Sequence, residues 1–211
     1  MNIRDQMDKI YRDIPPENIP WNISESPELL INLFESGKIK PGKIVDLGCG
    51  VGNYSIWLAQ KGFDVTGIDI SQQAINLAMK QAENVGIKCR FFACDLLGDL
   101  KEFHYSFDFA MDWEVLHHIF PEDRPTYMEN VHKLLKANGQ YFTVCFSEED
   151  KSFGTTEKYR ETPLGTTLYF SSEQELRELY KPFFKILEMN TVEIPGKFGV
   201  HTVIASLSTT N

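Results

Sequence analysis

A glycine-rich segment, VDLGCGVGN at residues 45–53, constrains the fold more than any other part of the sequence. It overlaps the end of an apolar, β-branched run at 43–48 and leads into a segment at 53–61 with helical spacing. We therefore expect a strand, a tight turn and a helix. Glycines in such a turn let the backbone approach a ligand closely, and the helix N-terminus that follows presents unpaired N–H groups. The segment predicts a site for a polar ligand at the end of a strand.

The same alternation of strand and helix patterns continues along the chain. Further strands are expected at 64–70, 89–96, 107–112 and 140–146. Ser71 is a suitable N-cap for the helix after the second strand, and the helix after the fourth is expected to end near Asn138 and Gly139. Such alternation is typical of a doubly wound α/β fold, in which helices cover both faces of a parallel sheet.

The last third of the chain departs from this alternation. Residues 147–167 are polar with little periodicity, which indicates an insertion or a flexible loop. Ser172 and Glu175 form a capping-box pattern at the start of a helix that Pro182 ends. Two strand patterns, at 184–194 and 201–207, then predict a hairpin.

Length and composition limit the classes of protein to consider. The chain of 211 residues fits one domain at 41–211, preceded by an N-terminal extension at 1–40 that contains a turn-rich stretch. A formal net charge of −9 opposes nucleic-acid binding. The sequence lacks a long apolar run and an apolar leader, so we expect a cytoplasmic protein without a membrane partner. Its four cysteines lack CxxC spacing, and neither disulfides nor a metal site is expected.

Three carboxylates lie at predicted strand ends. Asp46 lies just before the glycine loop, where it would repel a pyrophosphate but suit a ligand with ammonium and sulfonium groups. Asn53 also replaces the third glycine of a dinucleotide-binding loop, so S-adenosylmethionine (SAM) is favoured over NAD. Asp69 suits ribose hydroxyls, and Asp95 suits an adenine amine. The alternative for Asp46 is a carboxylate that braces the loop without touching the ligand.

With these motifs, the sequence resembles the class I SAM-dependent methyltransferases over residues 43–206. The resemblance is carried by VDLGCGVGN, GIDIS, ACDL and DWEVLHHI. It implies a Rossmann-like, seven-stranded sheet, mostly parallel with an antiparallel last strand. Pro20 and Trp21 are similar to a feature of the thiopurine and tellurite-resistance branches.

The resemblance also implies roles for individual residues. Gly48 and Gly50 would form the platform for the methionine part of SAM, and Asp112 would offer its backbone carbonyl to the methionine amine. Asp69 would bind the ribose and Ile70 the adenine, whose edge would face Asp95 and Leu96. Tyr11 and Trp21 of the extension would close over the cofactor as a cap.

Four residues after the predicted fourth strand are candidates for the acceptor side. His117 and His118 are adjacent, so their side chains are expected to point apart, and we select His117 as a general base for an oxygen acceptor. His118, Trp113 and Glu114 are then candidates for holding the acceptor. The alternative for the histidines is a pair of neutral rings that shape the pocket, and core packing explains Trp113 equally well.

Together these patterns predict methyl transfer from SAM to a small-molecule acceptor, with S-adenosylhomocysteine (SAH) as product. The alternatives are a non-catalytic SAM-binding regulator and an NAD-dependent oxidoreductase. A base-directed nucleic-acid methyltransferase is disfavoured, because DWEV stands where such enzymes carry a proline-aromatic motif. The sequence indicates neither the acceptor nor the oligomeric state.

Overall fold

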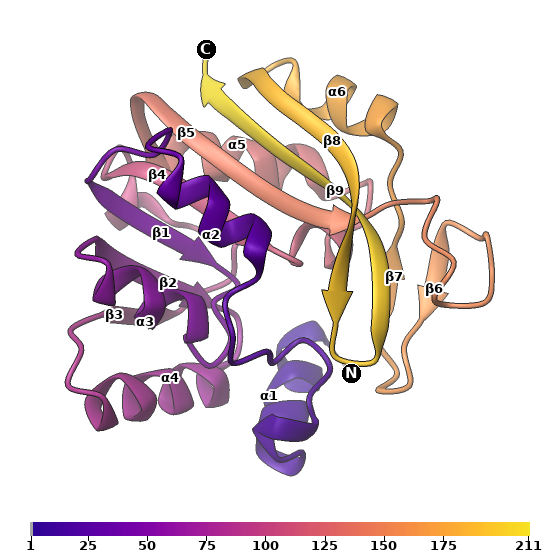
Figure 1. The fold of residues 1–211 in the computed structure, drawn as a ribbon, viewed down its shortest axis with the longest axis horizontal. Helices are drawn as coiled ribbons and strands as arrows, with labels where there is room; N and C mark the ends of the chain where they lie inside the picture. The colour runs from indigo at the N-terminus through magenta and orange to yellow at the C-terminus, as the bar shows by residue number, and fades with distance from the viewer. Residues whose placement is uncertain (1) are drawn as a thin grey trace. The chain divides into compact units, whose positions relative to one another are not determined.

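The computed structural model describes residues 2–211 and divides them into two compact units (Figure 1). The first unit ends at Asp99, and the second is Leu100–Asn211. The strand order is β3-β2-β1 in the first unit and β4-β5-β9-β8 in the second. The N-terminal 40 residues are thus part of a larger compact unit, and their role as a cap stays a prediction.

The first unit is a three-stranded parallel sheet with its helices. Apolar side chains of β1 and β2 are buried, and α3 and α4 pack against β2. In chain order its elements are α1 (Ile3–Asp13), η1 (Pro16–Asn18), α2 (Glu28–Glu35), β1 (Lys43–Leu47), α3 (Asn53–Gln60), β2 (Asp64–Asp69), α4 (Gln72–Asn84) and β3 (Arg90–Ala93).

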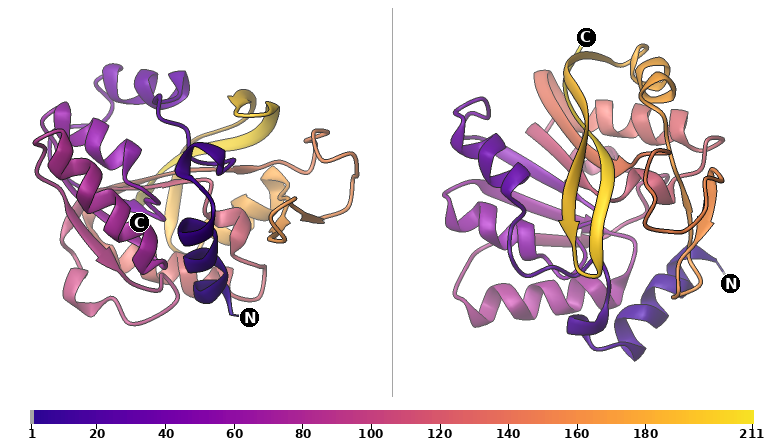
Figure 2. Two further views of the ribbon diagram at one scale, coloured as in Figure 1. Left: turned by 90° about the horizontal axis from the view of Figure 1, so that it is seen from below. Right: turned by 45° about the vertical axis from the view of Figure 1, so that its right-hand side comes forward.

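The second unit pairs β4 in parallel with β5 and places β9 antiparallel between β5 and β8. The right-hand view of Figure 2 shows β8 and β9 as a long hairpin. Its elements are η2 (Lys101–Phe103), β4 (Phe107–Trp113), η3 (Leu116–His118), α5 (Arg124–Leu134), β5 (Leu135–Phe146), β6 (Tyr159–Glu161), β7 (Thr167–Tyr169), α6 (Glu173–Tyr180), β8 (Phe184–Gly196) and β9 (Gly199–Thr210).

The predicted Rossmann-like fold is confirmed. The three strands of the first unit and the four of the second are the seven strands expected, and the last of them, β9, is the antiparallel one. None of the helices within residues 2–211 is long and apolar enough to cross a membrane.

Local signals in the sequence give most element boundaries. Ser71 caps α4, with its Oγ accepting a hydrogen bond from the N–H of Ala74 at 3.1 Å. The capping box of Ser172 and Glu175 is present at the start of α6, which ends before Pro182. The hairpin expected from the two C-terminal strand patterns is also confirmed.

Two boundaries were predicted wrongly. Helix α5 ends at Leu134, and β5 begins at once, so the turn signal at Asn138 and Gly139 lies inside the strand. Asn138 has a φ of 61° there, where the register between β4 and β5 shifts, so the signal marks an irregular strand rather than a helix end. The third strand is also shorter than predicted, because Cys94 and Asp95 lie beyond its end.

The segment at 147–167 is structured, so of the two alternatives for it, an insertion or a flexible loop, the flexible loop is wrong. It contains β6, which pairs with β7. Arg160 on β6 is fully buried, and its guanidinium donates hydrogen bonds to the carbonyls of Glu148, Asp150 and Glu157. The guanidinium also lies 3.8 Å from the ring centroid of Phe170. One cation therefore ties this segment to its own backbone and to an aromatic ring.

Candidate functional site

The glycine loop adopts the geometry that its sequence predicts. Gly48 and Gly50 have φ values of 69° and 53°, in the left-handed region that glycine tolerates best. The N–H of Gly48 donates to the carbonyl of Ile68 at 2.7 Å, which ties the loop to the neighbouring strand. A Cβ atom on Gly50 would lie 2.9 Å from the Oη of Tyr11. The loop therefore has a backbone conformation that favours glycine, with Tyr11 packed close to Gly50.

Asp69, at the end of β2, is buried, with 7% of its surface exposed. One carboxylate oxygen accepts the N–H of Gly50 at 2.9 Å and the other accepts the N–H of Ser71 at 2.8 Å. A carboxylate has about four acceptor positions, and the backbone N–H of Ile70 also acts on this group, so at least one position stays for a ligand. Burial raises the pKa of Asp69 to about 6, although the backbone N–H groups of Ser71, Gly50 and Ile70 act to lower it. The side chain both braces the glycine loop and offers acceptors for hydroxyl groups.

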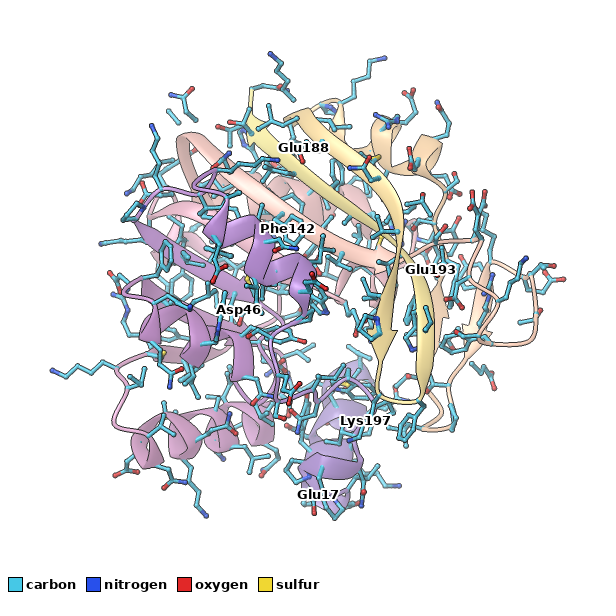
Figure 3. All side chains as sticks on the ribbon, in the orientation of Figure 1. Glu17, Asp46, Phe142, Glu188, Glu193 and Lys197 are labelled. Carbon is cyan, nitrogen blue, oxygen red and sulfur yellow. The ribbon has the colours of Figure 1, made fainter. Side chains whose placement is uncertain are left out.

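Asp46, on β1, is also buried (Figure 3). One of its carboxylate oxygens accepts a hydrogen bond from the hydroxyl of Ser55 on α3 at 2.6 Å. This contact matches the bracing alternative, since it fixes α3 to the end of β1. Ser55 was not singled out in the sequence, because a serine in a helix carries no signal of a buried partner nine residues earlier. A ligand contact for Asp46 stays a prediction.

The remaining cofactor candidates of the first unit lie where β2 and β3 end. Asp95 accepts the N–H of Leu97 at 2.9 Å through a side-chain oxygen, and the Leu96 side chain is buried. The carbonyl of Ile70 accepts a hydrogen bond from the guanidinium of Arg4 at 3.0 Å. The structure therefore brings Asp69, Ile70 and the glycine loop together, and it adds Arg4, which the sequence did not indicate.

The N-terminal residues are fixed to this part of the first unit. The indole N–H of Trp21 donates to the hydroxyl of Tyr11 at 2.9 Å, and their rings meet edge to face. On α1, a carboxylate oxygen of Asp8 accepts the hydroxyl of Ser71 at 2.6 Å and the N–H of Gln73 at 3.1 Å. Helix α1 was missed in the sequence, although its buried residues Met7, Ile10 and Tyr11 follow the helical period.

In the second unit, Asp112 anchors the turn that follows β4. Its side chain is buried, with one oxygen accepting the N–H groups of Val115 and Leu116 at 2.8 and 3.3 Å. The other oxygen accepts the hydroxyls of Tyr127 and Tyr141 at 2.8 and 3.1 Å. Burial raises the pKa of Asp112 to about 6. All four acceptor positions are used, so this carboxylate is structural, and the role of its backbone carbonyl stays a prediction.

Glu114 has the unusual backbone of this turn. Its φ is 67°, a left-handed conformation that costs about 1–3 kcal/mol for residues other than glycine and occurs most often at functional sites. The Glu114 N–H donates to the carbonyl of Val144 at 2.8 Å, and the side chain is half-buried. Burial, and then the charge of Asp112, raise the pKa of Glu114 to about 7.

The two histidines lie in η3, and their expected divergence is wrong. Their ring centroids are 4.8 Å apart, because the rings of this tight turn tilt toward one another. The Nδ1 of His117 accepts the N–H of Phe146 at 3.4 Å, and the His117 ring stacks on that of Phe146. Burial lowers the pKa of His117 well below its usual range and that of His118 to about 4. A lowered pKa makes each imidazole a weaker base, and the packing of His117 on Phe146 matches the structural alternative.

Two further side chains support the turn. Arg124, buried on α5, donates to the carbonyls of Ile119 and Leu116 at 2.8 and 3.2 Å. Trp113 is buried, and its ring centroid lies 6.4 Å from that of Phe142. Core packing thus accounts for Trp113. A search of residues 2–211 finds no group of three or more His, Cys, Asp or Glu side chains that could hold a metal ion.

Comparisons with known proteins all find methyltransferases. Residues 44–139 match the family model for a methyltransferase domain. The chain is 24% identical over 197 residues to the 2-heptyl-1-hydroxyquinolin-4(1H)-one methyltransferase of Mycobacteroides abscessus, covering 92% of this chain and 82% of that one. It is 30% identical over 122 residues to an uncharacterised methyltransferase of Schizosaccharomyces pombe, covering 58% and 83%. A crystal structure of a SAM-dependent methyltransferase from Methanosarcina mazei has a TM-score of 0.73 at 25% identity and covers 84% of this chain and 96% of that one.

Proposed function

This chain belongs to the SAM-dependent methyltransferases, and from that premise we propose that its methyl acceptor is a small molecule. It is an enzyme whose cofactor is SAM. Family membership sets aside the NAD-dependent oxidoreductase. Methyl transfer follows from family membership, and the class of the acceptor is the part that we propose.

The first unit has the chemistry to hold SAM. The observation that carries this point is Asp69, which is buried at the end of a strand and has an acceptor position left for a ribose hydroxyl. Gly48 and Gly50 both have positive φ values, and a Cβ on Gly50 would meet the hydroxyl of Tyr11. Among residues 2–211, no cationic side chain contacts Asp69, so the ligand's own positive charge would meet an acidic group.

We assign the residues of the first unit to parts of the ligand as the sequence predicted. Asp69 would accept the ribose hydroxyls, and the loop would contact the methionine part. Ile70, Asp95 and Leu96 would contact the adenine. When bound, SAM supplies an electrophilic methyl group on a sulfonium. Tyr11 lies beside Gly50 of this loop and accepts a hydrogen bond from Trp21, which supports their proposed place over the cofactor.

A small-molecule acceptor is supported by the second unit and by one relative. The turn after β4 offers a half-buried carboxylate and a half-buried imidazole, from Glu114 and His118, rather than a basic surface. A net charge of −9 disfavours a phosphate backbone as acceptor. The relative from Mycobacteroides abscessus is named for a quinolone acceptor, and it aligns with 92% of this chain.

The experiment is methyl transfer from isotopically labelled SAM to a panel of small molecules, with transfer RNA and a histone mixture as macromolecular controls. Labelled small molecules together with unlabelled macromolecules are the expected result. Labelling of RNA or protein alone would contradict the proposal. SAH binding without transfer to any compound would instead favour the non-catalytic regulator.

A further inference from the structure

We propose that Asp8 is a positioning residue for the cofactor. From helix α1 it fixes the backbone at residues 70–73, and it thereby holds Asp69 and Ile70 in place for the adenosine half of SAM. This inference rests on the assignment of Asp69 and Ile70 in the proposed function. It concerns the first unit alone, and it gives an N-terminal residue a role that requires no contact with the ligand.

The Asp8 side chain lies at the start of α4, although the residue belongs to α1. Its Oδ1 atom accepts the hydroxyl of Ser71 at 2.6 Å and the N–H of Gln73 at 3.1 Å. The first N–H groups of a helix have no acceptor within that helix, and the hydroxyl oxygen of Ser71 serves only the N–H of Ala74. Asp8 is therefore a second N-cap for α4, supplied from 63 residues before Ser71, and a carboxylate suits that helix end.

The backbone that Asp8 holds continues directly from the cofactor candidates. Asp69 ends β2, Ile70 follows it, and Ser71 is the N-cap of α4. The N–H of Ser71 donates to the Asp69 carboxylate at 2.8 Å, so a shift of Ser71 would also move the carboxylate assigned to the ribose. Arg4, one turn before Asp8 on α1, donates to the carbonyl of Ile70 at 3.0 Å. Two side chains of one helix thus fix the turn on which the adenosine contacts depend.

One face of α1 makes all of these contacts. Arg4, Asp8 and Tyr11 are spaced i, i+4 and i+7, so their side chains share one side of the helix. Tyr11 reaches the glycine loop, since a Cβ on Gly50 would lie 2.9 Å from its hydroxyl oxygen. Docking of α1 and fixing of the turn at 70–73 are therefore one event. A ligand that needs the fixed turn must favour the docked helix, and the docked helix must favour the ligand by the same factor.

The charge of Asp8 has a second effect, which the choice of pH keeps separate. Burial is the main cause of the raised pKa of Asp69, and the charge of Asp8 adds to it. Because that pKa is about 6, Asp69 is ionised at pH 8 whether or not Asp8 carries a charge. Binding measured at pH 8 therefore reports how well the turn is held, and not how far Asp69 is protonated.

The test is calorimetric titration of the full chain at pH 8 with SAH and with methylthioadenosine, which keeps the adenosine half but lacks the amino-acid part. Asp8→Ala removes the acceptor, whereas Asp8→Asn keeps an oxygen that can accept from Ser71 and Gln73. Asp5→Ala is the matched control, because it removes an exposed carboxylate from the same helix.

We expect Asp8→Ala to weaken both ligands by the same factor, about 5–50-fold, because the turn at 70–73 serves the half that they share. Asp8→Asn and Asp5→Ala should stay within about threefold of the wild type, since both keep the hydrogen bonds to α4.

Hydrogen exchange of the wild type gives a readout that needs no variant. Saturating SAH should slow exchange at the N–H groups of Gln73 and Ala74 and also along α1, because the coupling is reciprocal. The slowing along α1 should be lost in Asp8→Ala and kept in Asp8→Asn.

The proposal is overturned if Asp8→Ala binds both ligands as the wild type does, even with a lower Tm, because Asp8 would then be purely structural. It is also overturned if SAH alone is weakened, if Asp8→Asn loses as much affinity as Asp8→Ala, or if SAH leaves the exchange of α1 unchanged. Failure of the wild type to bind SAH, or normal binding of methylthioadenosine by Asp69→Ala, would overturn the proposed function instead.

Discussion

Replacing Arg160 by methionine tests how the segment at 147–167 is held together. The change keeps a long side chain but removes a cation that is fully buried and donates hydrogen bonds to three backbone carbonyls. Leaving a buried carbonyl unpaired costs about 1–3 kcal/mol, and the change also leaves the buried carboxylate of Asp150, 3.8 Å from the guanidinium, without its cation. We expect Arg160→Met to lower the free energy of unfolding by about 3–5 kcal/mol, which corresponds to roughly 6–20 °C in Tm.

The assay is urea unfolding followed by circular dichroism, with hydrogen exchange to locate the change. Faster exchange at 148–161 is expected, because the carbonyls that Arg160 joins lie there. Arg177→Met is the matched control, since Arg177 pairs with Glu173 at the surface and should change stability by less than about 0.5 kcal/mol. A loss below about 1 kcal/mol for Arg160→Met, or unchanged exchange in the segment, would refute this reasoning.

Three further predictions concern the candidate site. Asp69→Ala should weaken SAH binding at least about tenfold by calorimetry, and should also lower the Tm of the free protein because Gly50 loses its acceptor. His117→Ala and His118→Ala should both keep the pH–rate profile of the wild type. His117→Ala should lose more stability, because the His117 ring stacks on Phe146. Loss of the acidic limb of the profile in either variant would support a histidine as general base. Because the folded-state pKa of Glu114 is raised from 4.5 to about 7, the stability of the wild type relative to Glu114→Gln should be greatest below pH 4.5 and decline as pH rises through 7. The decline should be about 1–2 kcal/mol in denaturation curves, since partial exposure reduces the effect; a flat difference would contradict the raised pKa.

The sequence predicted the first unit well because its signals are local. A strand, a glycine turn and an N-cap occupy a few consecutive residues, so the places of Gly50, Asp69 and Ser71 follow from spacing alone. Parallel strands end at one edge of a sheet, and the carboxylates after them are brought to that edge. The partners of those carboxylates, such as Ser55 and Asp8, come from other elements and had no local signal.

The features of the second unit that the sequence did not indicate depend on contacts between different segments of the chain. Arg160 is held by carbonyls up to twelve residues away and by the ring of Phe170, a pattern without periodicity. The left-handed backbone of Glu114 depends on Asp112 and Val144, so it could not be predicted from a glutamate between apolar residues. The choice of His117 relied on helical phase, which a three-residue 3₁₀ turn does not follow.

Calorimetric titration of the full chain with SAH, and separately with NADH, tests the central claim most directly. If the acidic strand ends and the glycine loop of the first unit form the SAM site, SAH binds with one site per chain and NADH does not bind. SAH should also raise the Tm, because it binds the folded state alone. Binding of NADH, or no heat and no shift in Tm at saturating SAH, would contradict the assignment of Asp69 and the glycine loop to SAM.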